Sequence, residues 1–278
     1  MNSPERFTKE ALAQRARELG YDDVSPRLVL DWAGQGLLDR PDRAGRGRGQ
    51  GVSSTWPANQ LQLFIAILQH RAYLPRKSLA SLCNIPVWTW LVWGDAYVPV
   101  RQAKRALRTW AGPATGGSAA RGRAAAQDVV ESLKPLGSTK ADRMRLVDAL
   151  TKQYFAGHRQ FDRGKLRPLL EAVIHPEGGS SAVGPREAPI SADIYLDLLE
   201  ARLWLARNLD RVTDEEWQRA RAAYRFAWLG YNRIQSSLAA DPQLGRMYLP
   251  GTDNDFANNA CAHLVTILGL LRSGARSG

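Results

Sequence analysis

Apolar residues recur along most of the chain at the three-to-four-residue spacing of amphipathic helices. No run of β-branched and aromatic residues is present that would supply a central sheet. Glycine, serine, alanine and proline crowd together in residues 112–127 and 176–189, which is typical of linkers. The pattern therefore predicts a mainly α protein whose helical segments are 1–111, 128–175 and 190–278.

The clearest periodic stretch lies in the last segment. Thr213 and Glu216 have the spacing of a capping box, and we expect a helix from about Asp214 to Ala240, before Pro242. Its seam positions, spaced as in a heptad repeat, are Trp217, Ala220, Tyr224, Ala227, Tyr231, Ile234 and Leu238. The partner of this seam lies in the same domain or in another subunit. Large aromatics alternating with alanine favour packing inside one domain.

Two short helices are expected near the start of the chain. Thr8 can cap the first, whose apolar face would carry Ala11, Leu12, Ala16 and Leu19 before Gly20 closes it. Ser25, followed by Pro26, can cap the second. Its inward positions would be Leu28, Trp32 and either Leu37 or Leu38. Two such helices joined by a tight turn form a helix-turn-helix, whose second helix can enter the major groove of DNA.

An arginine-rich and glycine-rich loop follows at residues 39–57. Its cations are Arg40, Arg43, Arg46 and Arg48. A glycine-rich backbone can approach a phosphate closely while guanidinium groups reach the oxygens. This loop is typical of the wing of a winged helix.

The first 82 residues resemble the mercury-resistance-regulator (MerR) type of winged-helix DNA-binding domain. The matching parts, in order, are Val24-Ser25-Pro26-Arg27, Gly36-Leu37-Leu38, the arginine-rich wing and Trp56-Pro57 before another helix. The resemblance implies a dimeric transcription regulator that binds a pseudo-palindromic operator. It also implies that Arg27 is the early arginine of the recognition helix and that Arg46 and Arg48 belong to the basic wing.

The chain departs from that family at two places. Leu30, Asp31 and Trp32 stand where the family usually has a basic residue followed by two aromatics. The long dimerising helix of the family is also not expected here, because Pro86 and Pro99 interrupt the stretch where it would run.

Three tryptophans, Trp88, Trp90 and Trp93, occur within six residues. They form either a partner surface, since tryptophan is enriched at binding hot spots, or a second hydrophobic core behind the winged helix. The core is the interpretation we favour.

A basic amphipathic helix is expected after Pro99. Its apolar face would carry Val100, Ala103, Leu107 and Trp110, and its basic face Arg101, Lys104, Arg105 and Arg108. The basic face is either simply solvated or follows DNA phosphates.

The net charge of +11 is concentrated in the first two thirds of the chain. Residues 1–111 contribute +7 and residues 112–175 contribute +5, whereas residues 176–278 contribute −1. This distribution points to a polyanionic partner of the N-terminal part.

Enzyme and metal chemistry have little support. The four histidines are scattered, and Cys83 and Cys261 have no second ligand at metal-binding spacing. Asp253, Asp255, Asn258 and His263 lack calcium-loop spacing, and no phosphate-binding or nucleophile motif occurs. We expect no catalytic activity, no cofactor and no metal. Without a signal peptide or a membrane-length apolar run, the expected location is the cytoplasm, with no membrane association.

The sequence predicts a mainly α protein with an N-terminal winged helix-turn-helix and an all-helical C-terminal region, which binds duplex DNA to regulate transcription. An accessory factor that bends DNA in recombination or excision, and an adaptor whose winged helix no longer binds DNA, remain alternatives. The candidate DNA contacts are Ser25, Arg27, Arg40, Arg43, Arg46, Arg48, Arg101, Lys104, Arg105 and Arg108. The candidate partner or dimer contacts are Trp88, Trp90, Trp93, Trp217, Tyr224 and Tyr231. Expected partners are double-stranded DNA, a second copy of the chain, and a protein or small-molecule effector at the C-terminal helical region.

Overall fold

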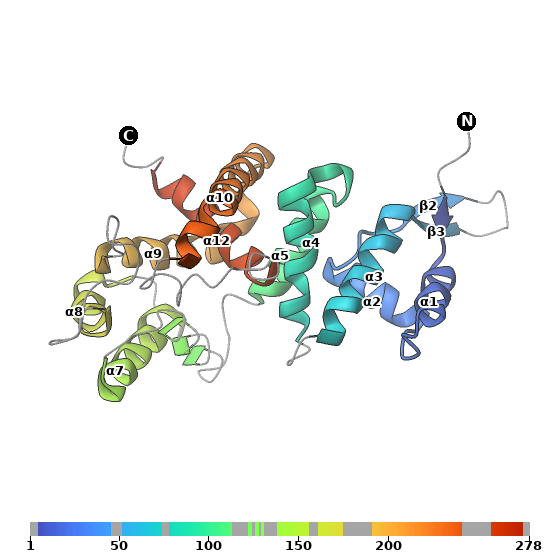
Figure 1. Cartoon of the computed structure of the whole chain (residues 1–278). Helices are drawn as coiled ribbons and strands as arrows, with labels where there is room; N and C mark the ends of the chain where they lie inside the picture. Colours follow the sequence, from blue (N-terminus) through green and yellow to red (C-terminus); the bar gives the residue numbers. More distant parts are fainter. Residues whose placement is uncertain are drawn as a thin grey trace. The chain divides into compact units, whose positions relative to one another are not determined.

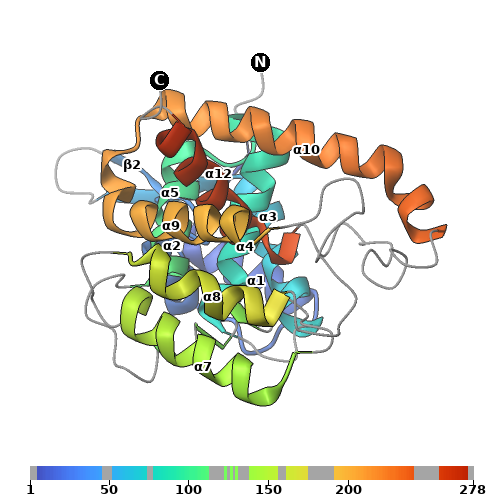
Figure 2. The ribbon, with the colours of Figure 1, turned by 90° about the vertical axis from the view of Figure 1, so that its left-hand side faces the viewer.

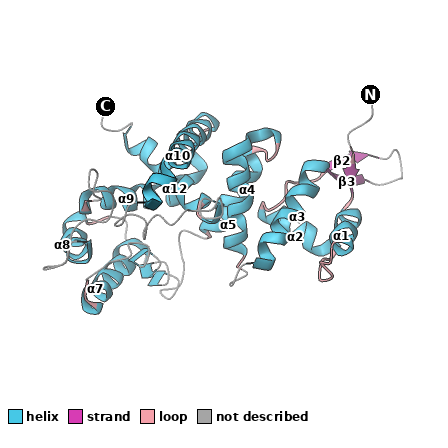
Figure 3. Ribbon diagram, viewed as in Figure 1, coloured by secondary structure: helices cyan, strands magenta, loops and turns pink. Residues whose placement is uncertain are grey.

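Helices make up most of the described chain in the computed structural model, and the strands form one small sheet (Figure 1 and Figure 3). The mainly α prediction is therefore confirmed. The structure describes residues 5–45, 52–73, 78–112, 122–123, 126–127, 129–130, 138–155, 161–174, 191–240 and 257–274. The chain divides into two compact units: Met1–Gly112 with Thr213–Leu264, and Pro113–Val212 with Val265–Gly278.

The first unit begins with strand β1 (Arg6–Phe7) and helices α1 (Lys9–Glu18) and α2 (Pro26–Gln35). The expected caps form: the Thr8 side chain accepts a hydrogen bond from the Ala11 N–H. One packing expectation is wrong, because Leu19 lies past the end of α1 and is exposed. Ala13 fills the buried face instead, beside Leu12 and Ala16.

A β-hairpin follows α2. Strands β2 (Asp42–Gly45) and β3 (Val52–Pro57) pair antiparallel, and β1 adds to the other edge of β3, giving the order β1-β3-β2. Phe7 lies opposite Trp56, whose side chain is fully buried. The sheet is thereby anchored to the helical core at Trp56.

Helices α3 (Ala58–Tyr73) and α4 (Leu79–Trp93) continue the unit. Pro86 lies inside α4 and does not interrupt it, which corrects the sequence expectation. A proline fits the helical φ, but inside a helix it removes one backbone hydrogen bond and its ring crowds the carbonyl one turn earlier, at a cost of about 3 kcal/mol. Burial of its neighbours, which include Val87 and Trp90, offsets that cost.

The chain turns through η1 (Gly94–Ala96) into helix α5 (Val100–Ala111), so the break expected at Pro99 is present. The buried face of α5 is rotated relative to the expected one. Its buried residues are Gln102, Ala103, Ala106 and Leu107, while Val100 and Trp110 are half-buried. The polar Gln102 therefore lies in the core.

The first unit is completed by chain that lies far away in sequence. Helix α10 spans Asp214–Ala240, as predicted, and appears in orange in Figure 2. The Trp217 ring packs edge-on against the Trp90 ring of α4, with 5.4 Å between ring centroids. At the start of helix α12 (Ala260–Gly274), the Cys261 N–H donates to the buried Asn84 side chain at 2.9 Å. Both cysteines are free and buried.

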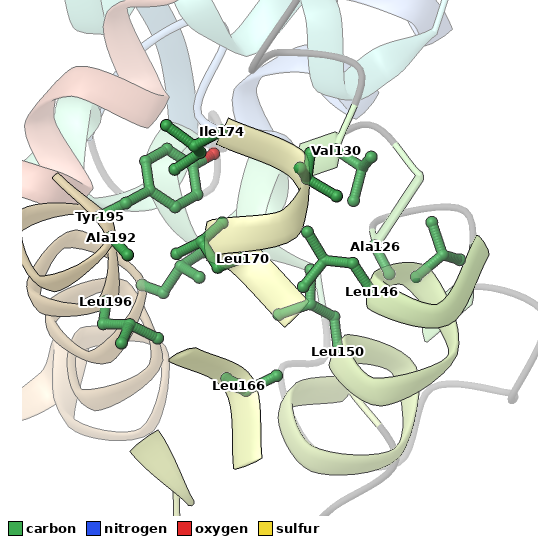
Figure 4. Packing of buried hydrophobic residues seen from close by; sticks show 13 residues of the cluster. Ala126, Val130, Leu146, Leu150, Leu166, Leu170, Ile174, Ala192, Tyr195 and Leu196 are labelled. Carbon is green, nitrogen blue, oxygen red and sulfur yellow. The ribbon is translucent and has the colours of Figure 1, made fainter. Parts of the chain in front are cut away.

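The second unit contains helices α7 (Lys140–Leu150), α8 (Arg163–Ile174) and α9 (Ala192–Asn208). A π-helical turn, η2 (Thr151–Phe155), extends α7, and η3 (Leu209–Arg211) follows α9. Side chains of α7, α8 and α9 converge on one apolar cluster, which Figure 4 shows. Its members include Leu146, Leu150, Leu166, Leu170, Tyr195 and Leu196.

These units do not follow the three segments expected from composition. Residues 190–278 do not form a domain of their own, because α9 shares the apolar cluster of α7 and α8 while α10 belongs to the first unit. The later part of α12 also packs on α9, where a side chain at Gly269 would overlap with the Ala201 backbone. Within the described residues, no helix has both the length and the apolar character required to cross a membrane.

Candidate nucleic-acid interface

The N-terminus of α2 presents the first candidate contact. The Ser25 hydroxyl caps the helix by accepting from the Leu28 N–H at 3.2 Å, and Pro26 occupies the first turn. Arg27 follows with 82% of its side chain exposed. Its only described ion-pair partner is Asp31, one turn along the same helix, at 3.0 Å from Nε to Oδ1. An exposed pair of this kind contributes little stability, so the guanidinium can exchange Asp31 for another acceptor.

Helix α2 has a buried side and an exposed side. Val29, Trp32 and Ala33 are buried, and the Trp32 ring packs edge-on against Phe64 of α3 at 5.3 Å between centroids. The exposed side carries Arg27, Leu30 and Gly34. The spacing of these three residues places them on one helix face. The inward role expected for Trp32 is confirmed, whereas Leu28 is only half-buried.

The β2–β3 hairpin supplies further cations. Arg40 and Arg43 are exposed at its start. Arg6 of β1 is engaged inside the sheet, where its guanidinium pairs with Asp42 and donates to the Thr55 hydroxyl at 2.9 Å. Arg46 and Arg48, the expected tip of the wing, lie outside the described residues.

A buried carboxylate, Asp39, joins the end of α2 to α5. Only 7% of its side chain is exposed. The Arg101 side chain donates from Nη2 to Oδ2 at 2.6 Å, and Arg105 donates from Nη2 to Oδ1 at 3.2 Å. Arg105 also donates to the Leu38 carbonyl at 3.1 Å. Two cations of the predicted basic face are thus bound to the turn that connects α2 with the hairpin.

Two glutamines extend this network into the core. The Gln60 Oε1 accepts from the Asp39 backbone N–H at 2.7 Å, and its Nε2 donates to the Gln102 Oε1 at 3.0 Å. Gln102 in turn donates to the Leu37 carbonyl at 3.0 Å. The Trp56 indole donates to the Asp39 carbonyl at 2.8 Å. Each of these buried polar groups therefore has a partner, which burial requires.

The charge state of Asp39 reflects two opposing effects. Burial by itself raises the pKa of this carboxyl. The hydrogen bonds from Arg101, the Arg40 N–H and Arg105, with the charge of Arg101, outweigh burial and hold the pKa below its usual value. Asp39 is consequently ionised at neutral pH and compensates the two arginines.

Gly36 allows α5 to approach this turn. Its backbone has a φ of 84°, in the left-handed region that closes α2. A side chain at this position would overlap with the backbone of Arg105 and Ala106. The Thr109 hydroxyl adds a hydrogen bond of 2.7 Å to the Gln35 carbonyl. Helix α5 therefore braces the turn between α2 and the hairpin.

The rest of the basic face of α5 is also largely engaged. Lys104 pairs with Asp214 of α10, and its ammonium lies 5.5 Å from the centroid of the Trp217 ring. Arg108 is exposed near the end of the helix. Arg101, Lys104 and Arg105, which were predicted to contact phosphates, thus pair with carboxylates of the unit itself.

The aromatic residues predicted at a partner interface separate into two groups. Trp90, Trp217 and Tyr224 are buried within the first unit, and Tyr231 is half-buried. The favoured interpretation of an intrachain core is confirmed for these residues as far as Tyr224. At Ala227 the expectation fails, because this residue is exposed; the side chains of the later seam positions Ile234 and Leu238 lie outside the described part of the structure.

The other group remains accessible. Trp93 is 47% exposed and meets Trp88 edge-on at 5.0 Å between ring centroids. Tyr97, also exposed, lies 6.1 Å from Trp93.

Sequence reasoning missed the residues that position the interface, namely Asp39, Gln60, Gln102 and Arg221. Arg221 donates to the Trp90 and Val92 carbonyls at 2.9 and 3.2 Å and so caps the end of α4. Gln60 and Gln102 could have been noticed as polar residues on otherwise apolar helix faces. Nothing local to Asp39 indicates that its partners lie 62 and 66 residues away.

Comparisons with known proteins gave no match: no family model, no curated protein and no solved structure matches the chain significantly. Among the described residues, no group of three or more His, Cys, Asp or Glu side chains is arranged to hold a metal ion.

Proposed function

We propose that the first 82 residues, which lie within the first unit, form a winged helix-turn-helix of the MerR type and that the protein binds duplex DNA as a transcription regulator. Helix α2 would enter the major groove, and the β2–β3 hairpin would lie along the phosphate backbone. One observation carries the proposal. Two exposed arginines lie on either side of one turn: Arg27 in the first turn of the capped helix α2, and Arg43 on the hairpin. Asp39 and α5 hold this turn in place.

Base recognition is assigned to the exposed side of α2. From the first turn, the planar Arg27 guanidinium can donate two hydrogen bonds to guanine O6 and N7. Leu30, one turn later on the same face, offers methyl groups to a thymine methyl. Leu30 replaces a basic residue of the MerR pattern, so an apolar contact would take the place of a phosphate contact.

Phosphate binding is assigned to the hairpin. Arg40 and Arg43 are exposed at its base, and Arg46 and Arg48 follow in the part that the structure does not describe. Guanidinium groups on a glycine-rich loop suit phosphate oxygens, which position the protein without reading sequence. Replacing Arg46 and Arg48 together by Ala should therefore weaken binding to all sequences about equally and flatten the salt dependence by roughly two units.

The test is a duplex selection followed by affinity measurements at several salt concentrations. Full-length protein is incubated with a random duplex library, and the enriched sequence is compared with a scrambled duplex by fluorescence anisotropy. We expect an enriched sequence and an affinity that falls steeply with salt, because released counterions drive phosphate binding. Absence of enrichment, or an affinity that is unchanged between low and physiological salt, would refute the proposal.

Dimeric binding is part of the proposal, since one winged helix covers about half of a typical specific site. Trp90, Trp217 and Tyr224 are buried and Tyr231 is half-buried, so Trp93, with Trp88 beside it, is the most accessible of the predicted interface residues. Sedimentation of the full chain with and without DNA tests this. The Trp93→Ser variant should shift the protein towards the monomer, and a monomer at all concentrations, even on DNA, would contradict it.

A second candidate function, a protein-interaction adaptor, is favoured by a different observation. Asp31 neutralises Arg27 on the exposed side of α2, and Arg101, Lys104 and Arg105 are engaged within the unit. The same salt-dependence measurement separates the two functions, because an adaptor has no salt-dependent affinity for duplex DNA.

A further inference from the structure

Helix α10 has two opposite faces with different chemistry. The inner face carries Trp217, Ala220 and Tyr224, all buried in the first unit. The other face carries what we call the outer stripe, which consists of Ala222, Arg225, Phe226, Leu229 and Arg233. All five members of the outer stripe are exposed. At 3.6 residues per turn, they occupy one side of the helix, opposite the inner face.

The centre of the outer stripe is apolar. Phe226 is 82% exposed and Leu229 is 45% exposed. Their three-residue spacing brings them together on the helix surface, with Ala222 one turn before Phe226. Single exposed apolar residues are ordinary, but an aromatic and a leucine side by side on a helix provide anchors of the kind that helix-in-groove recognition uses.

The flanks of the outer stripe are positively charged. Within the described residues, neither Arg225 nor Arg233 has an ion-pair partner. Another cation of α10, Arg221, senses the charge of Arg225: burial and that charge both lower the pKa of Arg221. The acidic residues of α10, Asp214, Glu215 and Glu216, are all in its first turn. The flanking arginines therefore lack local carboxylates.

This charge pattern excludes some occupants. Two copies of the chain pairing antiparallel about Phe226 and Leu229 would bring four arginines, Arg225 and Arg233 of each copy, into one interface without a carboxylate. Duplex DNA would accept the arginines but leave Phe226 and Leu229 without an apolar partner. Three apolar residues over two turns provide less apolar surface than an interfacial membrane helix uses.

We propose that the outer stripe of α10 is a docking surface for an acidic amphipathic helix of a protein partner. Apolar side chains of that helix cover Phe226 and Leu229, and its carboxylates pair with Arg225 and Arg233. These two arginines are eight residues apart, about 12 Å along the helix axis. This surface is separate from α2 and the hairpin, so the inference does not depend on DNA binding.

The experiment uses the full chain and a designed probe peptide. The probe is a labelled amphipathic helix of about three heptads, with leucine at the seam positions and glutamate beside them. A matched peptide has lysine in place of every glutamate. Fluorescence anisotropy should show binding of the glutamate peptide that weakens with salt, and no binding of the lysine peptide.

Variants locate the binding surface. Phe226→Ser should weaken binding of the glutamate peptide at least about tenfold, as loss of a central aromatic anchor does. Arg225→Glu combined with Arg233→Glu should abolish that binding and allow the lysine peptide to bind instead. Tyr73→Ser, a change at an aromatic that is 87% exposed on α3, is the matched control and should leave binding unchanged.

The outcomes that overturn the proposal are equally definite. One is a glutamate peptide that does not bind, or that loses affinity equally in Phe226→Ser and Tyr73→Ser. Another is self-association that Phe226→Ser abolishes, which would assign the stripe to a second copy. Binding to vesicles of phosphatidylcholine and phosphatidylglycerol that depends on Phe226 while the peptide fails to bind would assign it to a membrane. Circular dichroism of each variant should show the helix content of the wild type, as expected for substitutions at exposed positions.

Discussion

The cations of α2 and the hairpin differ from those of α5 in what they already bind. Arg27 has only an exposed carboxylate one turn away, and Arg43 is exposed on a strand. Arg101 and Arg105, by contrast, share the buried Asp39, and Lys104 pairs with Asp214. In sequence, α5 is the more basic region: residues 100–111 carry four cations and no acidic residue, whereas residues 26–57 carry five arginines and three aspartates. The difference teaches that a basic helix face can serve the architecture of the unit to which it belongs instead of being available to bind a nucleic acid.

The largest effect is expected from Asp39→Ala. Removing this carboxylate leaves Arg105, whose side chain is 15% exposed, as an uncompensated cation and releases Arg101. The free energy of unfolding should fall by about 3 to 5 kcal/mol, as it does when one partner of a buried pair is lost. Urea unfolding monitored by circular dichroism measures it.

The control for that variant is Asp42→Ala, which breaks the exposed pair with Arg6. This substitution should lower the free energy of unfolding by less than about 1 kcal/mol, which is the usual contribution of an exposed ion pair. Equal costs for the two variants would show that Asp39 does not brace the turn.

A smaller effect is expected from Arg27→Ala, measured as affinity for DNA. Loss of two hydrogen bonds to one guanine should weaken the binding free energy by about 1 to 3 kcal/mol on the selected sequence and by less on scrambled DNA. Arg15→Ala, which removes an exposed arginine paired with Glu18 on α1, is the matched control and should leave both affinities unchanged. An equal loss on both duplexes would instead make Arg27 a phosphate anchor.

The salt dependence of DNA binding compares the two regions directly. Arg43→Ala should reduce the slope of log affinity against log salt by about one unit, because one phosphate contact is lost. Lys104→Ala should leave the slope unchanged, since this ammonium pairs with Asp214 within the unit. If Lys104→Ala flattened the slope as much as Arg43→Ala does, the distinction between the two regions would be wrong.

The smallest effect is a pH dependence. The pKa of Asp39 is lower in the folded protein than in the unfolded chain, so its ionised form stabilises the fold. That contribution is complete above the unfolded pKa, near pH 4, and is lost as the pH falls through the folded pKa. The difference in unfolding free energy between the wild type and Asp39→Asn should therefore shrink below about pH 4. A difference that stays constant from pH 7 to pH 3 would contradict this.

Local signals predicted the parts of the fold that local chemistry determines. Thr8 and Ser25 were recognisable as helix caps, and the capping box at Thr213 gave the start of α10. The order of helices and hairpin followed from the same kind of signal. Arg27 was singled out by the resemblance to the MerR pattern, not by a local signal of its own, and the structure leaves its side chain exposed.

Long-range contacts determine what the sequence did not reveal. The contact of Trp217 with Trp90 and the hydrogen bond from Cys261 to Asn84 join segments more than 120 residues apart. No periodicity within one segment indicates which distant helix will cover it. For the same reason, the amphipathic pattern of α5 did not distinguish Arg105, which is bound to Asp39, from a cation free to meet a phosphate.

The discontinuous first unit has a consequence for synthesis on the ribosome. Its N-terminal portion ends at Gly112 and its completing portion begins at Thr213. At roughly 5 to 20 residues per second, the intervening stretch takes about 5 to 20 seconds to translate. During that interval the Trp90 side of α4 has no Trp217 to cover it, so the nascent chain displays an apolar surface to which a chaperone can bind before the unit closes.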